Sequence, residues 1–597
     1  MIALLPIFIL SFAIIVLLIA LFVYKLETKK CAILATSALI CALISSSILG
    51  ILISYNTPAI TDISSDNMQI SVATPQDTSS QGTSSQGTSS QGTTTQETTS
   101  QDSTDTDLST EQTIAVDAVP TEQETSSAQN EQISEPIAQE SDDFVGPPQN
   151  IDDNPQVDDT QSKWRAHQIT ALFTCDGYGL LYTSLILIIA IVVASLAYQW
   201  FIQEKVEHGL FYVILLFMAL GGITLVYASH LMSFCLGVEM LSIPFVGLIG
   251  YQYMQTHALE AAIKYMILSA IASSFLLMGI AFYYAATGEL TFSGLSYQLS
   301  TMSYPSILLL IGICLILVGI GFKLSLVPFQ LWLPDVYQGA PTVVALLLST
   351  VGKVALFCAM ARLFLLAPIV NNETIRIILV SMAFCSILWG NLSALMQRSL
   401  KRLLAYSSIA HFGYLLIALI AVQYQVLALE TIGVYLIGYI LANICILGVI
   451  SLESHSNELQ DHENEIDLSG LFWRRPVLAL TMGIGFLSLA GVPLTAGFVG
   501  RFLLILLGVT AELWWLIAAV VIGSAIGLYF YARLILNLYI RPTHDEQSNY
   551  NSNNRLKWQD ITVSESLIVL AAVLTIICGV YPKWLFNLVS MAQYLTT

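Results

Sequence analysis

Charged residues are scarce in this sequence. Only 11% of its 597 residues are Asp, Glu, Lys or Arg, whereas 55% are hydrophobic. Its nine cysteines are scattered, without a CxxC pair or a Cys/His cluster. A disulfide framework, a structural zinc site and an iron–sulfur cluster are therefore not expected. The scarcity of charge places the chain in the membrane class rather than among soluble globular proteins.

The net charge of −19 arises from one segment. Between Thr57 and Arg165, 20 Asp/Glu residues stand against only Lys163 and Arg165, and the remainder of the chain is close to neutral. The charge therefore carries no information about a partner, and no nucleic acid is expected. The same segment repeats TSSQG three times and has almost no aromatic residues. We predict that it is disordered, because it cannot bury enough apolar surface to offset its ordering entropy. A tolerated loop insertion is the simpler interpretation, and an extracytoplasmic tether or shield is the alternative.

Long apolar runs make up most of the remaining sequence. About 20 helical residues suffice for one bilayer crossing. Fourteen such runs are predicted, at 4–24, 31–53, 178–202, 209–229, 231–250, 258–286, 306–327, 341–367, 375–396, 403–423, 427–452, 476–508, 512–538 and 562–590. The first lacks a basic n-region and an A-x-A-like site, and we expect a retained helix. The sequence thus predicts an all-α polytopic membrane protein.

The placement of Lys and Arg predicts the orientation. If the N-terminus lies outside, twelve Lys/Arg residues fall in inside loops and four fall in outside loops. This asymmetry follows the positive-inside rule. Both termini and the 57–165 insertion are therefore predicted to lie on the outer side of the membrane.

A few ionisable side chains remain inside the predicted spans. They are Glu239, Lys264, Lys323, Lys353, Arg362, Arg501 and Arg533. A charge at the bilayer centre costs about 2.5–3.5 kcal/mol on insertion scales, so such groups usually face the bundle interior and mark ion or proton paths. Lysine suits a proton relay, because burial lowers its pKa and a nearby carboxylate raises it. An acid–lysine pair can thus be switched by changing its separation.

Some of these residues also allow a structural interpretation. Glu239 could reach the interface from a helix end, which would be a structural role. Lys353 lies deep in its span, which favours a role in an ion or proton path. Lys264 could snorkel from the inner end of its helix, or pair with Glu260 one turn earlier. His411 lies about ten residues into its helix and is compatible with polar packing as well as with a relay.

For the remaining cations, the position within the helix indicates the role. Arg362 and Arg533 lie nearer helix ends, which favours anchoring. Lys401 and Arg402 lie at the inner edge of their helix, where they serve topology first and the end of a proton path second.

Two apolar runs are interrupted, by KLSLVPFQLWLP in the seventh and SLAGVPLTAGF in the twelfth. Pro328 follows Lys323 by five residues, and a proline frees carbonyls of the preceding turn. Broken backbone at membrane depth is tolerated only inside protein or beside water. We predict that Lys323 lies at a break lined by free carbonyls and water, where its ammonium can gain or lose a proton. The second break, near Arg501, has a comparable place, and discontinuous helices in corresponding halves mark transporter sites.

Four stretches carry a family resemblance. They are EAAIKYMILSAIASSFLLMGIAFYYAATGEL, GFKLSLVPFQLWLPDVYQGAPT, KRLLAYSSIAHFGYLL and SLAGVPLTAGFVGRF. They resemble the antiporter-like membrane subunits of the proton-translocating NADH–quinone oxidoreductase, respiratory complex I, and among these subunit N. The resemblance runs from about Asp176 to the C-terminus, includes the first two helices and leaves out 57–165.

The resemblance implies about 14 transmembrane helices, in which helices four to eight and nine to thirteen form two inverted five-helix repeats, each with a broken helix. Together with the composition of 57–165, it divides the chain into two first helices at 1–56, a disordered acidic Ser/Thr/Gln-rich extracytoplasmic insertion at 57–165 and an antiporter-like core at 166–597. It also implies a chain of ionisable residues along the middle of the bilayer. Its members are Glu239, Lys323 as the partner of Glu239, Lys353, His411 and, at a further family lysine, Lys264.

Arg501 departs from the family pattern, in which the motif GFxGKF has a lysine at this place. Arginine does not lose its proton in proteins. Arg501 can therefore hold a fixed charge and order water, but it cannot easily alternate as a proton carrier. Because of this departure, the residues that release the proton are not identified by the resemblance.

The resemblance implies a proton-translocating subunit in a bacterial inner membrane, with the insertion and both termini in the periplasm. No cofactor is expected in this chain, and NADH, FMN, iron–sulfur clusters and quinone would be used by other subunits. The expected partners are the other membrane subunits of complex I, the lipid bilayer, protons and water. A subunit of a cation/proton antiporter is the alternative. A purely structural subunit is a third hypothesis, against which the deep Glu and Lys residues argue.

Overall fold

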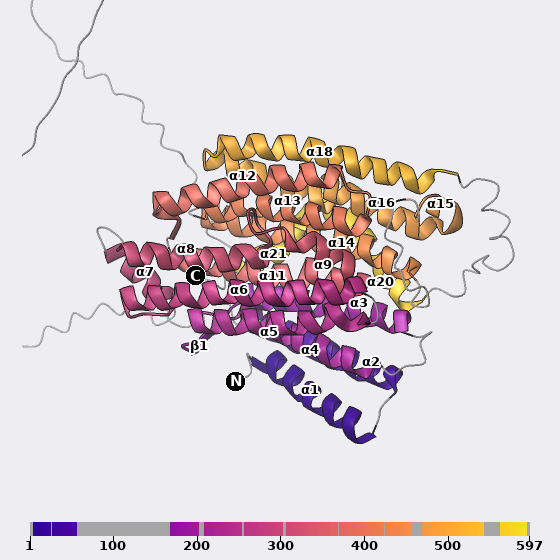
Figure 1. The fold of residues 1–597 in the computed structure, drawn as a ribbon, viewed down its shortest axis with the longest axis horizontal. Coiled ribbons are helices and arrows are strands. Elements are labelled where there is room, and N and C mark those ends of the chain that lie inside the picture. Colours follow the sequence, from indigo (N-terminus) through magenta and orange to yellow (C-terminus); the bar gives the residue numbers. More distant parts are fainter. Residues whose placement is uncertain are drawn as a thin grey trace, which may run out of the picture. The chain divides into compact units, whose positions relative to one another are not determined.

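The computed structural model describes residues 4–24, 27–55, 167–201, 208–253, 256–301, 306–367, 369–422, 424–454, 465, 468–541 and 562–593. The predicted disorder at 57–165 lies outside the described residues. Helices dominate the described part of the chain (Figure 1). Thirteen helical segments in it are long and apolar enough to cross a membrane, which confirms the all-α polytopic fold.

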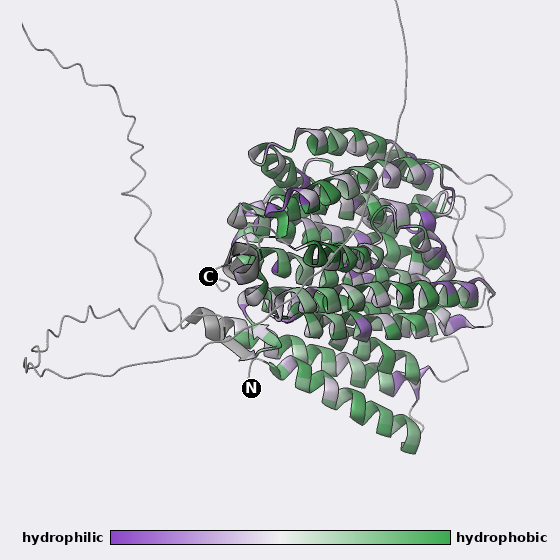
Figure 2. Ribbon diagram, turned by 60° about the vertical axis from the view of Figure 1, so that its left-hand side comes forward, coloured by the Kyte–Doolittle hydropathy of each residue, from purple (hydrophilic) through white to green (hydrophobic). Residues whose placement is uncertain are grey.

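The crossing segments follow the predicted apolar runs closely. They are α1 (Leu5–Tyr24), α2 (Thr28–Tyr55), α3 (Gly177–Phe201), α4 (Gly209–Val226), α5 (Leu231–Ile249), α6 (Thr256–Thr287), α8 (Ile307–Leu324), α10 (Thr342–Leu347) continued by α11 (Lys353–Leu366), α12 (Glu373–Leu395), α13 (Leu400–Ile420), α14 (Gln425–Glu453), α18 (Trp514–Tyr539) and α20 (Val563–Val580). Hydrophobic residues cover most of these helices, outward faces included (Figure 2). Outward apolar faces suit a lipid environment.

Both predicted interruptions are real breaks in the helices. The first separates α8 from the short α9 (Trp332–Gly339). The second divides the run at 476–508 into α16 (Pro476–Ala490) and α17 (Ala496–Thr510), so this run is not one continuous helix. At this break Gly491 has a φ of 75°, a left-handed conformation that glycine adopts at little cost.

The last predicted run, 562–590, is wrong in its extent. Its helix α20 ends at Val580, and a separate α21 (Pro582–Gln593) follows. The residue before a proline disfavours helical backbone, which explains the end at this point.

Several short elements were not expected from the sequence. A hairpin of β1 (His167–Thr170) and β2 (Phe173–Cys175) precedes α3, and Phe173 pairs further with Ala228. The short helices α7 (Phe292–Thr301) and α15 (Leu471–Arg474) lie between crossing segments. Such short elements carry too few apolar residues for periodicity to reveal them.

The most buried helices lie in the middle of the bundle. Buried residues make up 94% of the crossing windows at Thr342–Leu366, Leu400–Ile420 and Leu427–Glu453, against 33% at Leu5–Val23. Contacts join α9 to α6 and α13, and α10 to α14. Any polar group on these central helices must find its partner inside the protein.

Candidate functional site

Lys323 lies in the last turn of α8, beside the first break. Ser325 adopts a left-handed conformation with φ 61°, and its backbone N–H donates to the carbonyl of Phe322 at 2.9 Å. The indole Nε1 of Trp332 donates to the same carbonyl at 3.0 Å, and the Leu326 N–H donates to the Gly321 carbonyl at 2.8 Å. The carbonyls predicted to be free thus accept from other groups, because the left-handed turn closes the helix end.

Hydroxyl groups hold the ammonium of Lys323 instead. Its Nζ donates to Ser242 Oγ of α5 and to Ser269 Oγ of α6, both at 2.6 Å. Serines are common in membrane helices and follow no telling spacing here, so the sequence alone did not single them out. These oxygens replace part of the hydration shell that the ammonium loses on burial.

Glu239 lies on α5, half-buried, and accepts a hydrogen bond from Ser273 Oγ of α6. Within the described part of the chain, no ion pair within 4.0 Å joins Glu239 to Lys323. The two are connected through α6 instead, because Ser269, which accepts from Lys323, lies one turn before Ser273. The family resemblance pairs Glu239 with Lys323, and in this structure the two groups are separated.

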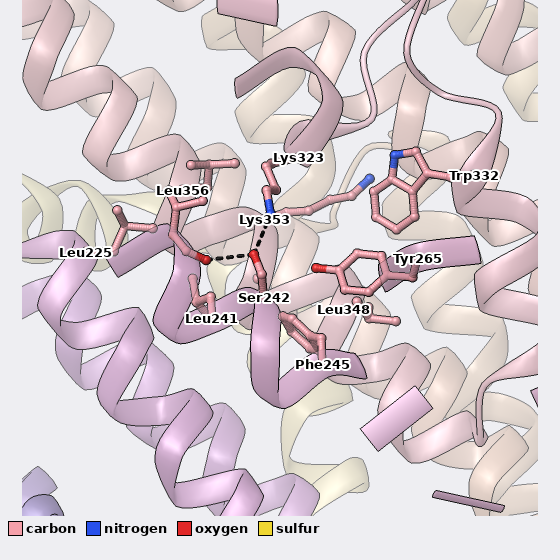
Figure 3. A pocket seen from close by; sticks show the side chains of 12 residues that line it. Leu225, Leu241, Ser242, Phe245, Tyr265, Lys323, Trp332, Leu348, Lys353 and Leu356 are labelled. Carbon is pink, nitrogen blue, oxygen red and sulfur yellow. Dashed lines mark hydrogen bonds between the residues drawn. The ribbon is translucent and has the colours of Figure 1, made fainter. Parts of the chain in front are cut away.

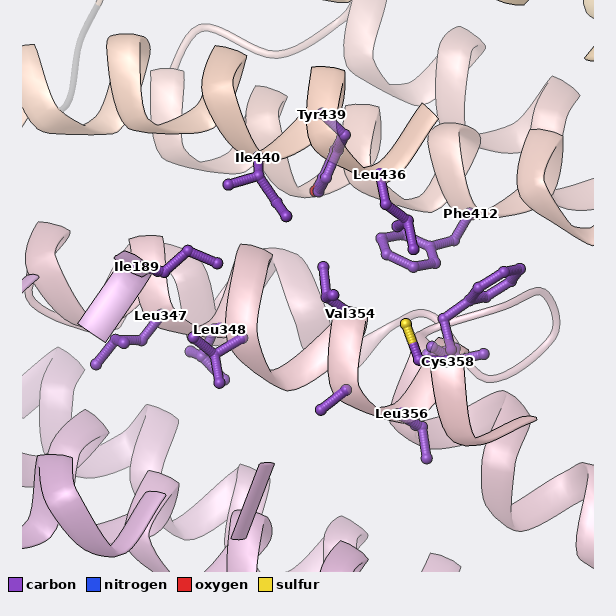
Figure 4. Packing of buried hydrophobic residues seen from close by; sticks show 14 of the residues in the cluster. Ile189, Leu347, Leu348, Val354, Leu356, Cys358, Phe412, Leu436, Tyr439 and Ile440 are labelled. Atoms are coloured by element: carbon purple, nitrogen blue, oxygen red, sulfur yellow. The ribbon is translucent and has the colours of Figure 1, made fainter. Parts of the chain in front are cut away.

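Lys353 is the most deeply buried of the predicted site residues, with 2% of its surface exposed. A π-helical turn, Leu348–Gly352, directly precedes it, and such turns often occur at functional sites. Its Nζ donates to Ser408 Oγ of α13 at 2.6 Å and lies 5.0 Å from the centre of the Phe412 ring. Apolar side chains of α11 and α14, including Val354 and Leu436, surround this region (Figure 4).

Lys323 and Lys353 line the same cavity (Figure 3). Ser242, Tyr265 and Trp332 contribute to its wall. The part of the cavity that the centre of a water molecule can occupy has a volume of about 30 Å³. One water needs roughly 10–15 Å³ by this measure, so there is room for about two between the lysines. Such waters could connect the two amines.

Hydroxyl groups continue the line beyond Lys353. Tyr439 of α14 donates from its hydroxyl to Ser408 Oγ at 2.8 Å. The rings of Tyr439 and His411 lie 5.4 Å apart, and His411 Nδ1 shares a hydrogen bond of 2.7 Å with the Tyr435 hydroxyl. The only sequence signal for the tyrosines is their spacing of one helical turn, which also suits ordinary packing.

Arg501 of α17 closes the second break. Its Nη1 donates to the carbonyl of Ala490 at 2.6 Å, and its Nη2 donates to the carbonyl of Leu489. These carbonyls belong to the last turn of α16, where no helical N–H is left for them. The guanidinium lies 5.4 Å from the Tyr414 ring and is 7% exposed. Arg501 is thus held as a fixed, buried cation that caps a helix end.

Lys264 lies apart from this line of residues. Its ammonium pairs with Glu260 at 2.8 Å and with Asp335 of α9 at 3.0 Å, and its side chain is 43% exposed. Arg402 pairs with the other oxygen of Asp335 at 2.8 Å. Burial opposes ionisation of Asp335, but hydrogen bonds from Arg402 and Lys264 outweigh it and lower the pKa of the carboxyl. Asp335, in WLPDVYQ, joins these two cations and was not singled out from the sequence.

The two remaining intramembrane cations fix connecting segments. Arg362 pairs with Asp176 at 2.6 Å, and both side chains are buried. Arg533 pairs with Glu465 and donates to the carbonyl of Gln397 at 3.1 Å. These contacts support the anchoring interpretation. Among the described residues, no group of three or more His, Cys, Asp or Glu side chains is placed to hold a metal ion.

Comparisons with known proteins agree with this architecture. Residues 228–527 match a family profile described as NADH:quinone oxidoreductase/Mrp antiporter, TM. A chain of respiratory complex I from Thermus thermophilus with bound aureothin is similar, with a TM-score of 0.65, 25% identity and coverage of 98% of both chains. A chain of the membrane-bound sulfane sulfur reductase, an archaeal respiratory membrane complex, has a TM-score of 0.60 and 25% identity, covering 70% of this chain and 82% of that one. A chain of the Mrp complex from a Dietzia species shares the fold, with a TM-score of 0.61 and 18% identity over 71% of this chain and 86% of that one.

Proposed function

This chain belongs to the NADH:quinone oxidoreductase/Mrp antiporter family of membrane proteins, and we propose that it is the proton-translocating subunit N of a bacterial NADH–quinone oxidoreductase. The observation that carries the proposal is the line from Lys323 through the shared cavity to Lys353, Ser408 and His411. A scaffold would gain nothing evident from two lysines, one half-buried and one fully buried, that face one small cavity.

The proposed cycle begins with the separation of Glu239 and Lys323. When quinone reduction elsewhere in the complex moves the carboxylate away, Lys323 loses its favourable field and gives its proton to Lys353 through the cavity. Ser408 and the tyrosine hydroxyls then pass the proton toward His411. Driving one charge against 100 mV costs about 2.3 kcal/mol, which a modest change of field can supply.

The chain itself would carry out no redox chemistry. NADH, FMN, iron–sulfur clusters and quinone would be bound by other subunits of the complex. The proposed location is the bacterial inner membrane, with the 57–165 insertion and both termini on the periplasmic side. Lys264 would then belong to the cytoplasmic surface, as part of an ion cluster with Asp335 and Arg402.

A subunit of a cation/proton antiporter is the second candidate, and the shared fold with an Mrp complex supports it. Coverage favours the first candidate, because the complex I chain matches 98% of this chain and the Mrp chain 71%. Purification from the native membrane separates the two. We expect flavin- and iron–sulfur-containing subunits to co-purify, whereas co-purification of membrane antiporter subunits alone would contradict the proposal.

The cap formed by Arg501 leads to a prediction about the far end of the relay. Arg501→Lys should keep proton pumping near the wild-type rate, because a lysine retains a cation that can donate to the carbonyls of Leu489 and Ala490. Arg501→Ala should lower pumping or assembly, because each buried carbonyl left unpaired costs about 1–3 kcal/mol. The pumping rate of both variants should be measured against pH. A new titration step in Arg501→Lys would show that position 501 carries protons, and the fixed-charge role would then be wrong.

A further inference from the structure

Tyr337 of α9 is a buried group that the relay described above does not use. Its side chain is fully buried, and its phenolic hydroxyl makes no hydrogen bond of standard length and angle. A buried tyrosine hydroxyl usually finds a partner. Leaving one unpaired costs about 1–3 kcal/mol. Phenylalanine would fill the same space without this cost, so packing alone does not account for the hydroxyl.

The surroundings of the hydroxyl connect it to the relay. The hydroxyls of Ser408 and Ser349 lie next to it. Ser408 Oγ already accepts from Lys353 Nζ at 2.6 Å and from Tyr439 at 2.8 Å. A serine oxygen has two lone pairs, and both are then in use. The proton of Ser408 then remains for donation, and the neighbouring Tyr337 oxygen is able to accept it.

Ser349 completes the local pattern on the other side of Tyr337. It belongs to the π-helical turn before Lys353, and its hydroxyl donates to the carbonyl of Leu346 at 2.9 Å. Its lone pairs remain able to accept a proton donated by Tyr337. Tyr337 therefore lies beside two serine hydroxyls, and one of them, Ser408, already accepts from Lys353.

The same short helix reaches the charged surface of the protein. Asp335 lies two residues before Tyr337, and Arg402 donates both to Asp335 at 2.8 Å and to Gln338 at 3.1 Å. Lys401 is 1% exposed, and its Nζ donates at 3.0 Å to the carbonyl of Ala340, directly after α9. Lys401 and Ser408 are seven residues apart on α13 and share one face of it. Helix α9 thus carries Tyr337 and, two residues before it, the Asp335 cluster of charged groups.

We propose that Tyr337 transfers protons from the Asp335 end of the bundle to Lys353 through Ser408, as a second proton supply that each cycle needs beside the one from Lys323. This inference rests on the proposed function. In the structure Lys353 donates to Ser408, which is the loaded arrangement. After Lys353 has lost its proton, the neutral amine accepts the proton of Ser408, and Ser408 accepts that of Tyr337. Tyr337 regains a proton from the Lys401 side, so that one proton moves and no electron does.

The test is Tyr337→Phe in the complete complex, with NADH-driven proton uptake measured in inverted membrane vesicles. Proton transfer by a positioned side chain contributes about 100-fold or more, and we expect pumping to fall at least about tenfold. Tyr283→Phe is the matched control, because Tyr283 is also fully buried with an unpaired hydroxyl but lies on α6, away from the relay. It should pump like the wild type. The solvent isotope effect on proton uptake should change in Tyr337→Phe only.

A second variant guards against a purely structural effect. Tyr337→His keeps a group that exchanges protons and should recover part of the pumping per assembled complex. Wild-type pumping by an assembled Tyr337→Phe complex would overturn this inference. If Lys353→Met then fails to pump, the proposed function stands without Tyr337. If Lys353→Met also pumps normally, the proposed function itself is wrong.

Discussion

Lys353→Met is expected to abolish proton translocation while the complex still assembles. Lys353 is the group on which the cavity, Ser408 and the hydroxyl of Tyr439 converge. Methionine fills similar volume and has no proton to exchange. The loss should reach about 100-fold in pumping rate, the lower end of what a positioned proton-transfer group contributes.

Assembly should survive this change for a physical reason. Replacing a buried charge by an apolar side chain of similar volume is often neutral or stabilising, because the desolvation penalty disappears. Ser408 would keep its hydrogen bond from Tyr439. The variant therefore separates transport from folding.

The measurement is proton uptake by inverted vesicles, normalised to the amount of complex on a native gel. Lys353→Arg should fail as well, because arginine keeps the charge but does not release its proton. Lys30→Met is the matched control, since its ammonium lies in an exposed ion pair with Glu27, away from the proposed proton paths. Exposed pairs contribute about 0–1 kcal/mol, and pumping should change little. Normal pumping by Lys353→Met would eliminate the relay.

Lys323→Met should have the second largest effect, with at least a tenfold loss of pumping, again on the scale of a lost proton-transfer group. The serines that hold Lys323 tolerate the change. Ser242 already donates to the carbonyl of Val238 at 2.7 Å and loses only an incoming bond. The fold should therefore persist while proton transfer from the first break to Lys353 stops.

Glu239 supplies the control for this second prediction. Glu239→Gln removes the field of the carboxylate but leaves the lysine proton in place, so pumping should fall less than in Lys323→Met. Glu239→Asp should do less harm still. The same vesicle measurement decides the order of the three variants. Equal activity of all three with the wild type would mean that the switching pair must be sought elsewhere.

The helices could be predicted from the sequence because the bilayer imposes one simple condition on them. A crossing helix needs about 20 apolar residues, and such runs are visible without any knowledge of packing. The breaks were visible for a similar reason, since Pro328 and Gly491 interrupt apolar runs. The end of α20 at Val580 was missed, because the residues after Pro582 remain apolar although the helix stops.

The candidate site was predictable only in part. Charged residues stand out in apolar runs, which led to Lys323, Lys353 and Arg501. Ser408 and Tyr337 did not stand out, because serine and tyrosine occur throughout these helices. Lys264 was included with the relay because the family resemblance has a lysine at this place, whereas the structure turns it toward Asp335 at the surface.

The sequence by itself determined the membrane class, the helical spans, the breaks and the small set of ionisable groups placed in apolar surroundings. Only the tertiary structure decided which of these groups share a cavity and which hydroxyls join them. The physical reason is that each decisive contact crosses between helices. Lys353 meets Ser408 across 55 residues of chain, and Lys323 meets Ser242 across 81. Apolar patterning specifies that a helix crosses the bilayer, but the direction in which one lysine points depends on side-chain packing against helices far away in the sequence.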